Sequence, residues 1–146
     1  MAFRQSYEAA SGSVRGAVTG SEPVIVLAHY TIPAGVAVND ITEICAIPHG
    51  CYVTGAAVYQ DGLGASCTCD VGVLSGVYAK NDDTRTIGNE IYSALAVATA
   101  GTSVRPTKNL MAITPSESAT GVGIKFTGAN PTAGKKISIA LTCASK

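Results

Sequence analysis

Apolar residues in this chain fall in short runs that are separated by turns rich in glycine and proline. The clearest case is residues 51–76, CYVTGAAVYQDGLGASCTCDVGVLSG, where two alternating apolar runs flank a glycine-rich stretch. Residues 52–59 and 66–74 carry the β-branched and aromatic side chains typical of strands. Between them, Asp61 and Gly62 supply the positive φ that a tight connection needs. We predict a β-hairpin here, and a hairpin has to bury one face against further strands.

Other parts of the chain supply such strands. Residues 23–31 (PVIVLAHYT) are almost continuously apolar, which predicts a strand that is buried on both faces. Residues 36–47 alternate in part, and we expect Ile41 and Ile44 to point inward.

Residues 136–144 show the clearest alternation. We expect one face to carry Ile137, Ile139 and Leu141, and the other to carry Ser138, Ala140 and Thr142. Two further predicted strands are residues 109–114 and 121–127.

Two segments between these strands differ in character. Residues 78–88 (YAKNDDTRTIG) are the most polar, and we predict an exposed loop. Residues 89–100 fit two patterns, because Ile91, Leu95 and Ala98 have helical spacing while alternate residues from Tyr92 onward fit one face of a strand. We favour a short helix for this segment.

The pattern as a whole predicts an all-β fold. About eight strands with turn signals every 8–15 residues suit an antiparallel β-sandwich, and the unequal loops favour a jelly-roll-like order over a meander. We expect one such domain over residues 22–146. Residues 1–21 are small and polar, with Phe3 and Tyr7 as their large side chains, and predict an extended N-terminal arm. The alternative for this segment is a disordered terminus.

Composition narrows the classes of partner. Ten basic residues balance ten acidic ones, so nothing marks the chain for nucleic acid or an anionic membrane. Only 14% of residues are charged, which indicates a surface that an assembly covers or a merely Ser/Thr/Gly-rich one. The sequence contains neither the apolar centre of a secretory signal nor a membrane-spanning run, so we expect synthesis in a cytoplasm.

The chain has five cysteines, an odd number that excludes complete pairing within one chain. Cys67 and Cys69 are two residues apart in a predicted strand and so share a face. Three interpretations stay open: small buried hydrophobic residues, a disulfide, and a zinc site that adds Cys45, Cys51 and His49. The candidates for a disulfide, within or between chains, are Cys51, Cys67 and Cys69.

No residues form a recognisable catalytic group. His29 lies in an apolar run and is predicted to be a core residue, while His49 lies in a Pro-His-Gly turn and is predicted to be solvated. No G-x-S-x-G motif surrounds a serine, and no cation adjoins the cysteines to activate a thiolate. We therefore expect a protein that is not an enzyme and that uses no cofactor or metal.

The order of these segments resembles small structural proteins of tailed bacteriophages. The resemblance covers about residues 31–143 and rests on IPAGVAVNDITEICAIPHGCYVTGAAVYQDGLGASCTCDVGVLSG, GNEIYSA, ITPSESATGVGIKFTG and the closing ISIALTC. Some of these proteins are capsid decoration (cement) or head-fibre proteins, which implies a β-sandwich that is often trimeric. Cys51, Cys67 and Cys69 stand where the family pattern leads us to expect small or β-branched residues, which favours a particular role such as covalent reinforcement.

The resemblance implies a virion structural protein. It would decorate and stabilise the capsid of a tailed phage as a homotrimer at capsomer junctions, with Phe3, Arg4 and Tyr7 of the arm contacting the capsid. The implied partners are the major capsid protein, further copies of the chain and other minor capsid proteins, but neither nucleic acid nor membrane. The implied location is the capsid surface, after assembly in the host bacterial cytoplasm.

Two other functions compete with this one. One is a β-sandwich binding module of a phage fibre or tail that recognises a host-surface glycan. The other is a small enzyme on a jelly-roll scaffold, which two distant histidines make a poor fit.

Overall fold

The computed structural model describes residues 2–5, 23–103 and 105–145. These ranges contain nine strands and one short 3₁₀ helix. The elements are β1 (Phe3–Gln5), β2 (Val24–Thr31), β3 (Ile41–Ile47), β4 (Cys51–Asp61), β5 (Thr68–Val73), β6 (Tyr92–Ala96), β7 (Ala100–Ser103), η1 (Leu110–Ala112), β8 (Thr120–Thr127) and β9 (Lys136–Ser145).

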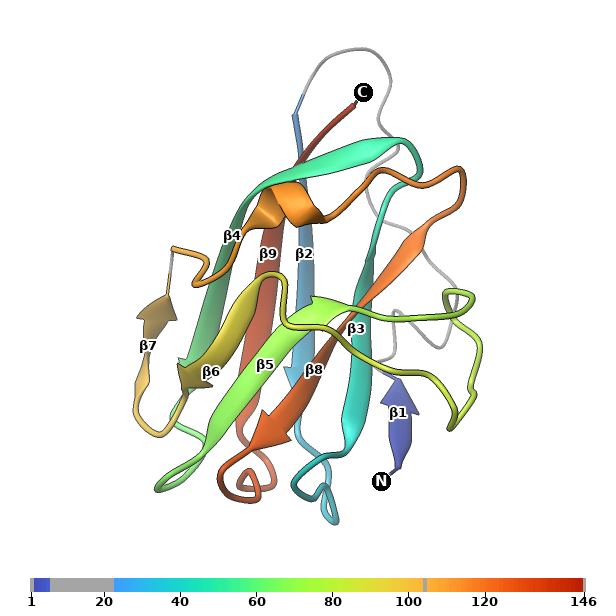
Figure 1. Ribbon diagram of the computed structural model, residues 1–146. Coiled ribbons are helices and arrows are strands. Elements are labelled where there is room, and N and C mark those ends of the chain that lie inside the picture. The colour runs from blue at the N-terminus through green and yellow to red at the C-terminus, as the bar shows by residue number, and fades with distance from the viewer. Residues whose placement is uncertain (1, 6–22, 104, 146) are drawn as a thin grey trace.

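The strands form two sheets that pack against each other as two layers (Figure 1). One is five-stranded, in the order β1-β3-β8-β5-β6, and the other is four-stranded, in the order β2-β9-β4-β7. Strands β2 to β5 alternate between the two sheets, and neighbours run antiparallel except β1 and β3. This arrangement confirms the predicted all-β, jelly-roll-like sandwich.

The core lies between the two sheets. The predicted alternation of β9 is confirmed, since Ile137, Ile139 and Leu141 are at most 1% exposed. Tyr92 of β6 crosses the core, and its hydroxyl donates to the carbonyls of Ala56 and Ser103 in the opposite sheet. Burial and the nearby Cys69 and Tyr59 raise the pKa of Tyr92 to about 12, so its phenol stays a neutral hydrogen-bond donor.

The predicted hairpin over residues 51–76 is wrong, although its strands and turn glycines are real. Strand β4 pairs with β7 and β9, whereas β5 pairs with β6 and β8 in the other sheet. Gly62 and Gly64 have φ values of 87° and 120°, as a tight bend requires. Between them, Leu63 is fully buried, and its N–H donates to Val97. The connection therefore closes one end of the sandwich instead of joining neighbouring strands.

Strand β2 is buried on one face only, which corrects the predicted burial on both. Val26, Ala28 and Tyr30 point into the core, while Ile25 is 67% and Leu27 is 42% exposed. The prediction failed because an apolar run does not reveal whether a second layer covers it.

His29 lies on the same outer face, so its predicted place in the core is also wrong. Its Nδ1 lies 2.6 Å from the hydroxyl oxygen of Ser138 on β9. His49 is exposed, as predicted.

Two local predictions of secondary structure are wrong. Residues 89–100 hold β6 and the start of β7 instead of a helix, and Ala94 has a φ of 49° that interrupts the alternation of β6. Residues 109–114 hold η1 instead of a strand, because the side chain of Asn109 accepts a hydrogen bond from the N–H of Met111 and stabilises a tight turn.

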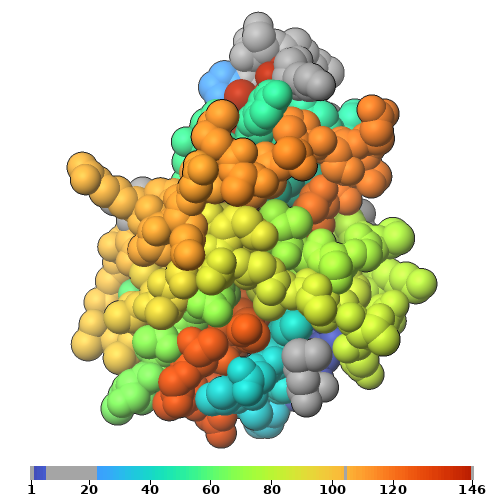
Figure 2. Space-filling model, viewed as in Figure 1, coloured from blue at the N-terminus to red at the C-terminus, as the bar shows by residue number. Residues whose placement is uncertain are grey.

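The described loops cover one sheet and leave the other open. The segments between β5 and β8, yellow-green to orange, form much of the near face in Figure 2, in front of the five-stranded sheet (Figure 2). All of β3 is consequently buried. In contrast, β2 alternates between exposed and buried residues.

Candidate functional site

The N-terminal strand β1 occupies a specific site on the edge of the five-stranded sheet. It runs parallel to β3, with Phe3 opposite Ile41 and Gln5 opposite Glu43. The N–H of Ile41 donates to the carbonyl of Ala2 at 2.9 Å, so the backbone pairing begins just before the strand. An edge strand held in this way adds main-chain hydrogen bonds and also places alternate side chains in separate pockets.

Phe3 occupies the apolar part of this site. This residue is 8% exposed and forms a small cluster with Ile41 and Leu74. The guanidinium carbon of Arg85 lies 4.9 Å from the centre of the Phe3 ring, within the range of a cation–π contact. A charged residue from a distant loop thus covers the ring.

Asp40 binds the backbone at the start of β1. Its carboxylate accepts hydrogen bonds from the N–H groups of Ala2 (2.9 Å) and Ala37 (3.1 Å) and from Nε of Arg4 (3.4 Å). Burial opposes the charged form of Asp40, but these hydrogen bonds outweigh it and lower its pKa. Arg4 also donates to the carbonyl of Gly35, at 3.0 Å, and this second bond fixes its side chain.

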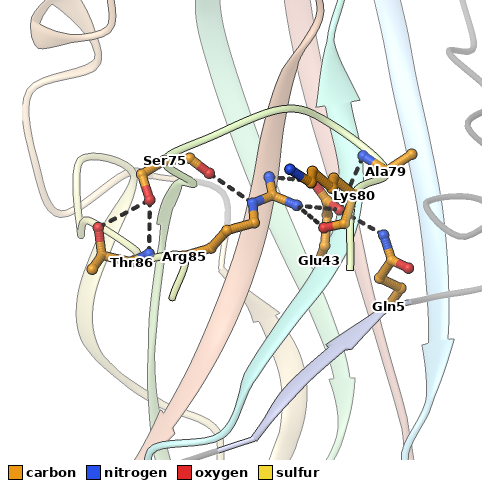
Figure 3. Close-up of polar contacts among 7 residues, drawn as sticks. All are labelled: Gln5, Glu43, Ser75, Ala79, Lys80, Arg85 and Thr86. Carbon is orange, nitrogen blue, oxygen red and sulfur yellow. Dashed lines mark hydrogen bonds and ion pairs between the residues drawn. The ribbon is translucent and has the colours of Figure 1, made fainter. Parts of the chain in front are cut away.

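A buried ion pair lies next to β1. Glu43 on β3 and Arg85 are 0% and 2% exposed at their side chains, and two bonds of 2.8 and 2.9 Å join them side by side (Figure 3). Gln5 and the N–H of Ala79 donate to the same carboxylate. Burying two charges costs free energy unless their remaining hydrogen-bond capacity is also satisfied.

Arg85 meets that condition through the backbone. Its Nε donates to the carbonyl of Ser75 at 2.6 Å, and its Nη1 donates to that of Lys80 at 3.0 Å. Residues 78–88 were predicted to be an exposed loop, and for Arg85 that prediction is wrong. The ion pair holds this loop against β3 and places Arg85 over Phe3.

Sequence reasoning missed Asp40, Glu43 and Arg85. One signal for Glu43 was available, since it is the single charged residue in the apolar run ITEICAI. A buried carboxylate in such a strand needs a cationic partner. Residue 121 is a glycine, and a Cβ at that position would collide with the carboxylate of Glu43. The partner itself lies 42 residues away and has no sequence signature.

The structure describes only part of the predicted arm. Phe3 and Arg4 lie in β1, bound to their own domain, while Tyr7 and residues 6–21 of the arm fall outside the described residues. Their role in contacting a capsid stays a prediction.

The five cysteines are buried, and none of them forms a disulfide in the structure. Burial raises the pKa of Cys51, Cys67 and Cys69, most strongly for Cys69, and together with the nearby Cys51 it raises that of Cys143 to about 11. Thiols in such surroundings are poor nucleophiles. Disulfides at Cys51, Cys67 or Cys69 stay a prediction.

Within the described ranges, no group of three or more His, Cys, Asp or Glu side chains is arranged to hold a metal ion. No helix in those ranges is long and apolar enough to cross a membrane.

Comparison with known proteins finds relatives by structure. No family model and no curated protein matches the sequence. A chain of the capsid of Ralstonia phage GP4 is 27% identical, with a TM-score of 0.90, and the match covers 99% of both chains.

Two further structures are similar in fold. A chain of the cyanophage Pam1 capsid asymmetric unit has a TM-score of 0.58 and 19% identity, with 92% of this chain and 96% of that one covered. A chain of the acid-stable capsid of Helicobacter pylori bacteriophage KHP30 has a TM-score of 0.51 and 14% identity, with 86% and 90% covered. The sequence resemblance to capsid-related proteins of tailed phages is thereby confirmed.

Proposed function

We propose that this protein decorates and stabilises the capsid of a tailed phage, as a homotrimer at the junctions between capsomers, and that it is not an enzyme. One observation carries the proposal: the likeness to a chain of the Ralstonia phage GP4 capsid extends over 99% of both chains. A match over the whole length indicates a shared role more strongly than a shared sandwich alone, because many unrelated functions use this fold.

The partners in this proposal are the major capsid protein, other minor capsid proteins and further copies of the chain. The balance of ten basic and ten acidic residues agrees with protein partners in place of nucleic acid or membrane. The virion surface is the proposed location, reached after assembly in the host cytoplasm.

The experiment is reconstitution on particles that lack this protein. Capsids made from the major capsid protein of the same phage are mixed with the purified chain, sedimented, and heated. We expect saturable co-sedimentation and a higher temperature of particle disruption. If the chain stays in the supernatant, the proposal is wrong, and binding on a glycan array would then support the fibre or tail module instead.

The arm is tested on the same particles. In one variant, residues 1–21 are deleted, and in a matched one residues 6–21 are replaced by a Gly/Ser linker of equal length that retains β1. We expect both variants to lose attachment, and the linker variant to keep the unfolding free energy of the wild type, because the contacts of Phe3 and Arg4 remain. Normal decoration by the linker variant would show that residues 6–21 do not bind the capsid.

A further inference from the structure

Most of the outer face of the four-stranded sheet carries no charged side chain across three strands. The strand registers place its outward side chains in rows that cross β2, β9 and β4. Three neighbouring rows carry no charged side chain, namely His29, Ser138 and Tyr59, then Leu27, Ala140 and Ala57, and then Ile25, Thr142 and Gly55. The next row beyond His29 pairs Thr31 with Lys136, so a charge lies at that end of the sheet. An antiparallel sheet with one solvated face normally carries polar residues there.

The relief of this face is uneven. Large side chains stand along β2, where Ile25 and Leu27 form what we call the ridge. Small residues line the neighbouring strands, chiefly Ala140, Ala57 and Gly55, and form the trough. The trough and its walls enclose a groove of about 620 Å³.

The ridge is costly to leave in water. Exposed apolar surface costs roughly 25 cal/mol per Å², and contiguous apolar patches on soluble proteins mark interaction sites. Ile25 is 67% exposed and Leu27 is 42% exposed. The outer face of the other sheet, in contrast, is covered by described loops. The uncovered face therefore has the properties of an interface.

We infer that a second copy of this chain covers this face, with the ridge of one copy seated in the trough of the next. Electrostatics favours a copy, because rows without Asp, Glu, Lys or Arg can stack on themselves without opposing like charges. Shape favours it too, since ridge and trough lie side by side and extend over the same rows. The inference deepens the proposed function, because it names the surface on which the trimer assembles.

When the ridge and the trough of one copy engage two different neighbours, the contact is head-to-tail. Such contacts close into a ring when the rotation between copies is a whole fraction of a turn, and a rotation of 120° gives a trimer. Each copy then uses both features, one toward each neighbour.

The test measures the solution mass of full-length variants by light scattering. Ile25→Glu places a charge on the ridge, and Ala140→Phe fills the trough. Val77→Glu is the matched control, because Val77 is also 67% exposed but lies in a loop after β5. We expect the wild type and the control to form the oligomer, and each of the other variants to have the mass of one chain, 14.7 kDa. Unchanged thermal unfolding would show that the variants fold.

A mixing experiment tests the head-to-tail geometry. Ile25→Glu copies keep an intact trough, and Ala140→Phe copies keep an intact ridge. Mixed together, they should form a complex of two chains that neither variant forms alone. A mixture that stays monomeric would show that ridge and trough do not meet.

Two results would overturn the inference. One is a wild-type chain that stays monomeric at its highest soluble concentration, and the other is an Ile25→Glu variant that assembles as well as Val77→Glu. The reconstitution on particles separates this failure from failure of the proposed function. A monomer that still decorates capsids overturns the inference alone, whereas a ring that binds no capsid overturns the proposed function alone.

Discussion

One carboxylate, that of Glu43, organises the polar contacts around the N-terminal strand. It accepts hydrogen bonds from Gln5 of β1, from Arg85 and from the N–H of Ala79. Three segments far apart in the sequence therefore meet at one side chain. Because Glu43 is completely buried, removing one of its partners leaves a charge that water cannot solvate.

Glu43→Gln should destabilise the fold strongly. The substitution keeps the shape of the side chain but leaves the Arg85 charge buried without a counter-charge, at a cost of about 3–5 kcal/mol. Denaturant unfolding measures this loss. The control is Asp70→Asn, which removes the partly exposed ion pair with Lys125 (3.8 Å) and should cost at most about 1 kcal/mol. Equal losses for the two variants would contradict the role assigned to Glu43.

Asp40 should make stability depend on pH in the acid range. Its pKa is lower in the folded chain, so it stabilises the fold at pH values above its unfolded pKa, about 3.9. That contribution is lost as the pH falls through the folded pKa. Below about pH 4, we expect the unfolding free energy of the wild type to fall more steeply than that of Asp40→Asn, in urea titrations at stepped pH. Parallel curves would refute this.

At the scale of elements, tertiary pairing decides where each strand bends and which strand it joins. The φ of 49° at Ala94 lies in the left-handed region, which costs an L-residue roughly 1–2 kcal/mol. It coincides with a shift in the pairing of β6 with β5, where Cys69 pairs with Leu95 but Val71 pairs with Tyr92, so that β6 has one extra residue. The bulge lets Tyr92 and Leu95 both point into the core, which a regular strand would not allow.

Ala94→Gly should therefore stabilise the protein. Glycine adopts positive φ without steric cost, and the gain exceeds its larger loss of chain entropy by about 0.5–1 kcal/mol. Ala96→Gly is the control, since Ala96 is exposed on the same strand and does not have positive φ. It should destabilise by about 0.5–1 kcal/mol in the same thermal unfolding assay. A loss of stability in Ala94→Gly would rule out strain at this position.

At the scale of the whole molecule, the described residues form one sheet that loops cover and one sheet that they leave uncovered. The chain folds its own loops over the five-stranded sheet, and the Glu43–Arg85 pair holds one of them in place. The four-stranded sheet exposes Ile25 and Leu27 instead. Decoration of a larger assembly fits a molecule whose own packing leaves one apolar face uncovered.

The mass of any oligomer should not depend on reductant. All five thiols are buried and none forms a disulfide in the structure, so noncovalent contacts are expected to hold the copies together. Light scattering with and without reductant should give the same mass. An oligomer that dissociates on reduction would instead indicate that Cys51, Cys67 or Cys69 forms a disulfide between chains.

The candidate site could be predicted only in part. Phe3 and Arg4 stood out as large or charged residues in a small-residue segment, and the structure places both in β1. Their partners Asp40 and Arg85 did not stand out, because an acidic residue in a turn and an arginine in a polar loop are usually solvated. Only the fold brings them to one edge of one sheet.

The sequence by itself determined the fold class and most of the strands. Alternation of apolar residues reports which side chains face a core, and glycines with positive φ mark where the chain bends, because both depend on local chemistry. Tertiary structure alone decided that β4 and β5 join different sheets, that one face of β2 stays open, and that Glu43 meets Arg85. The physical reason is that the pairing of strands and the covering of a sheet face depend on contacts between residues far apart in the chain. Local sequence patterns do not reveal these contacts.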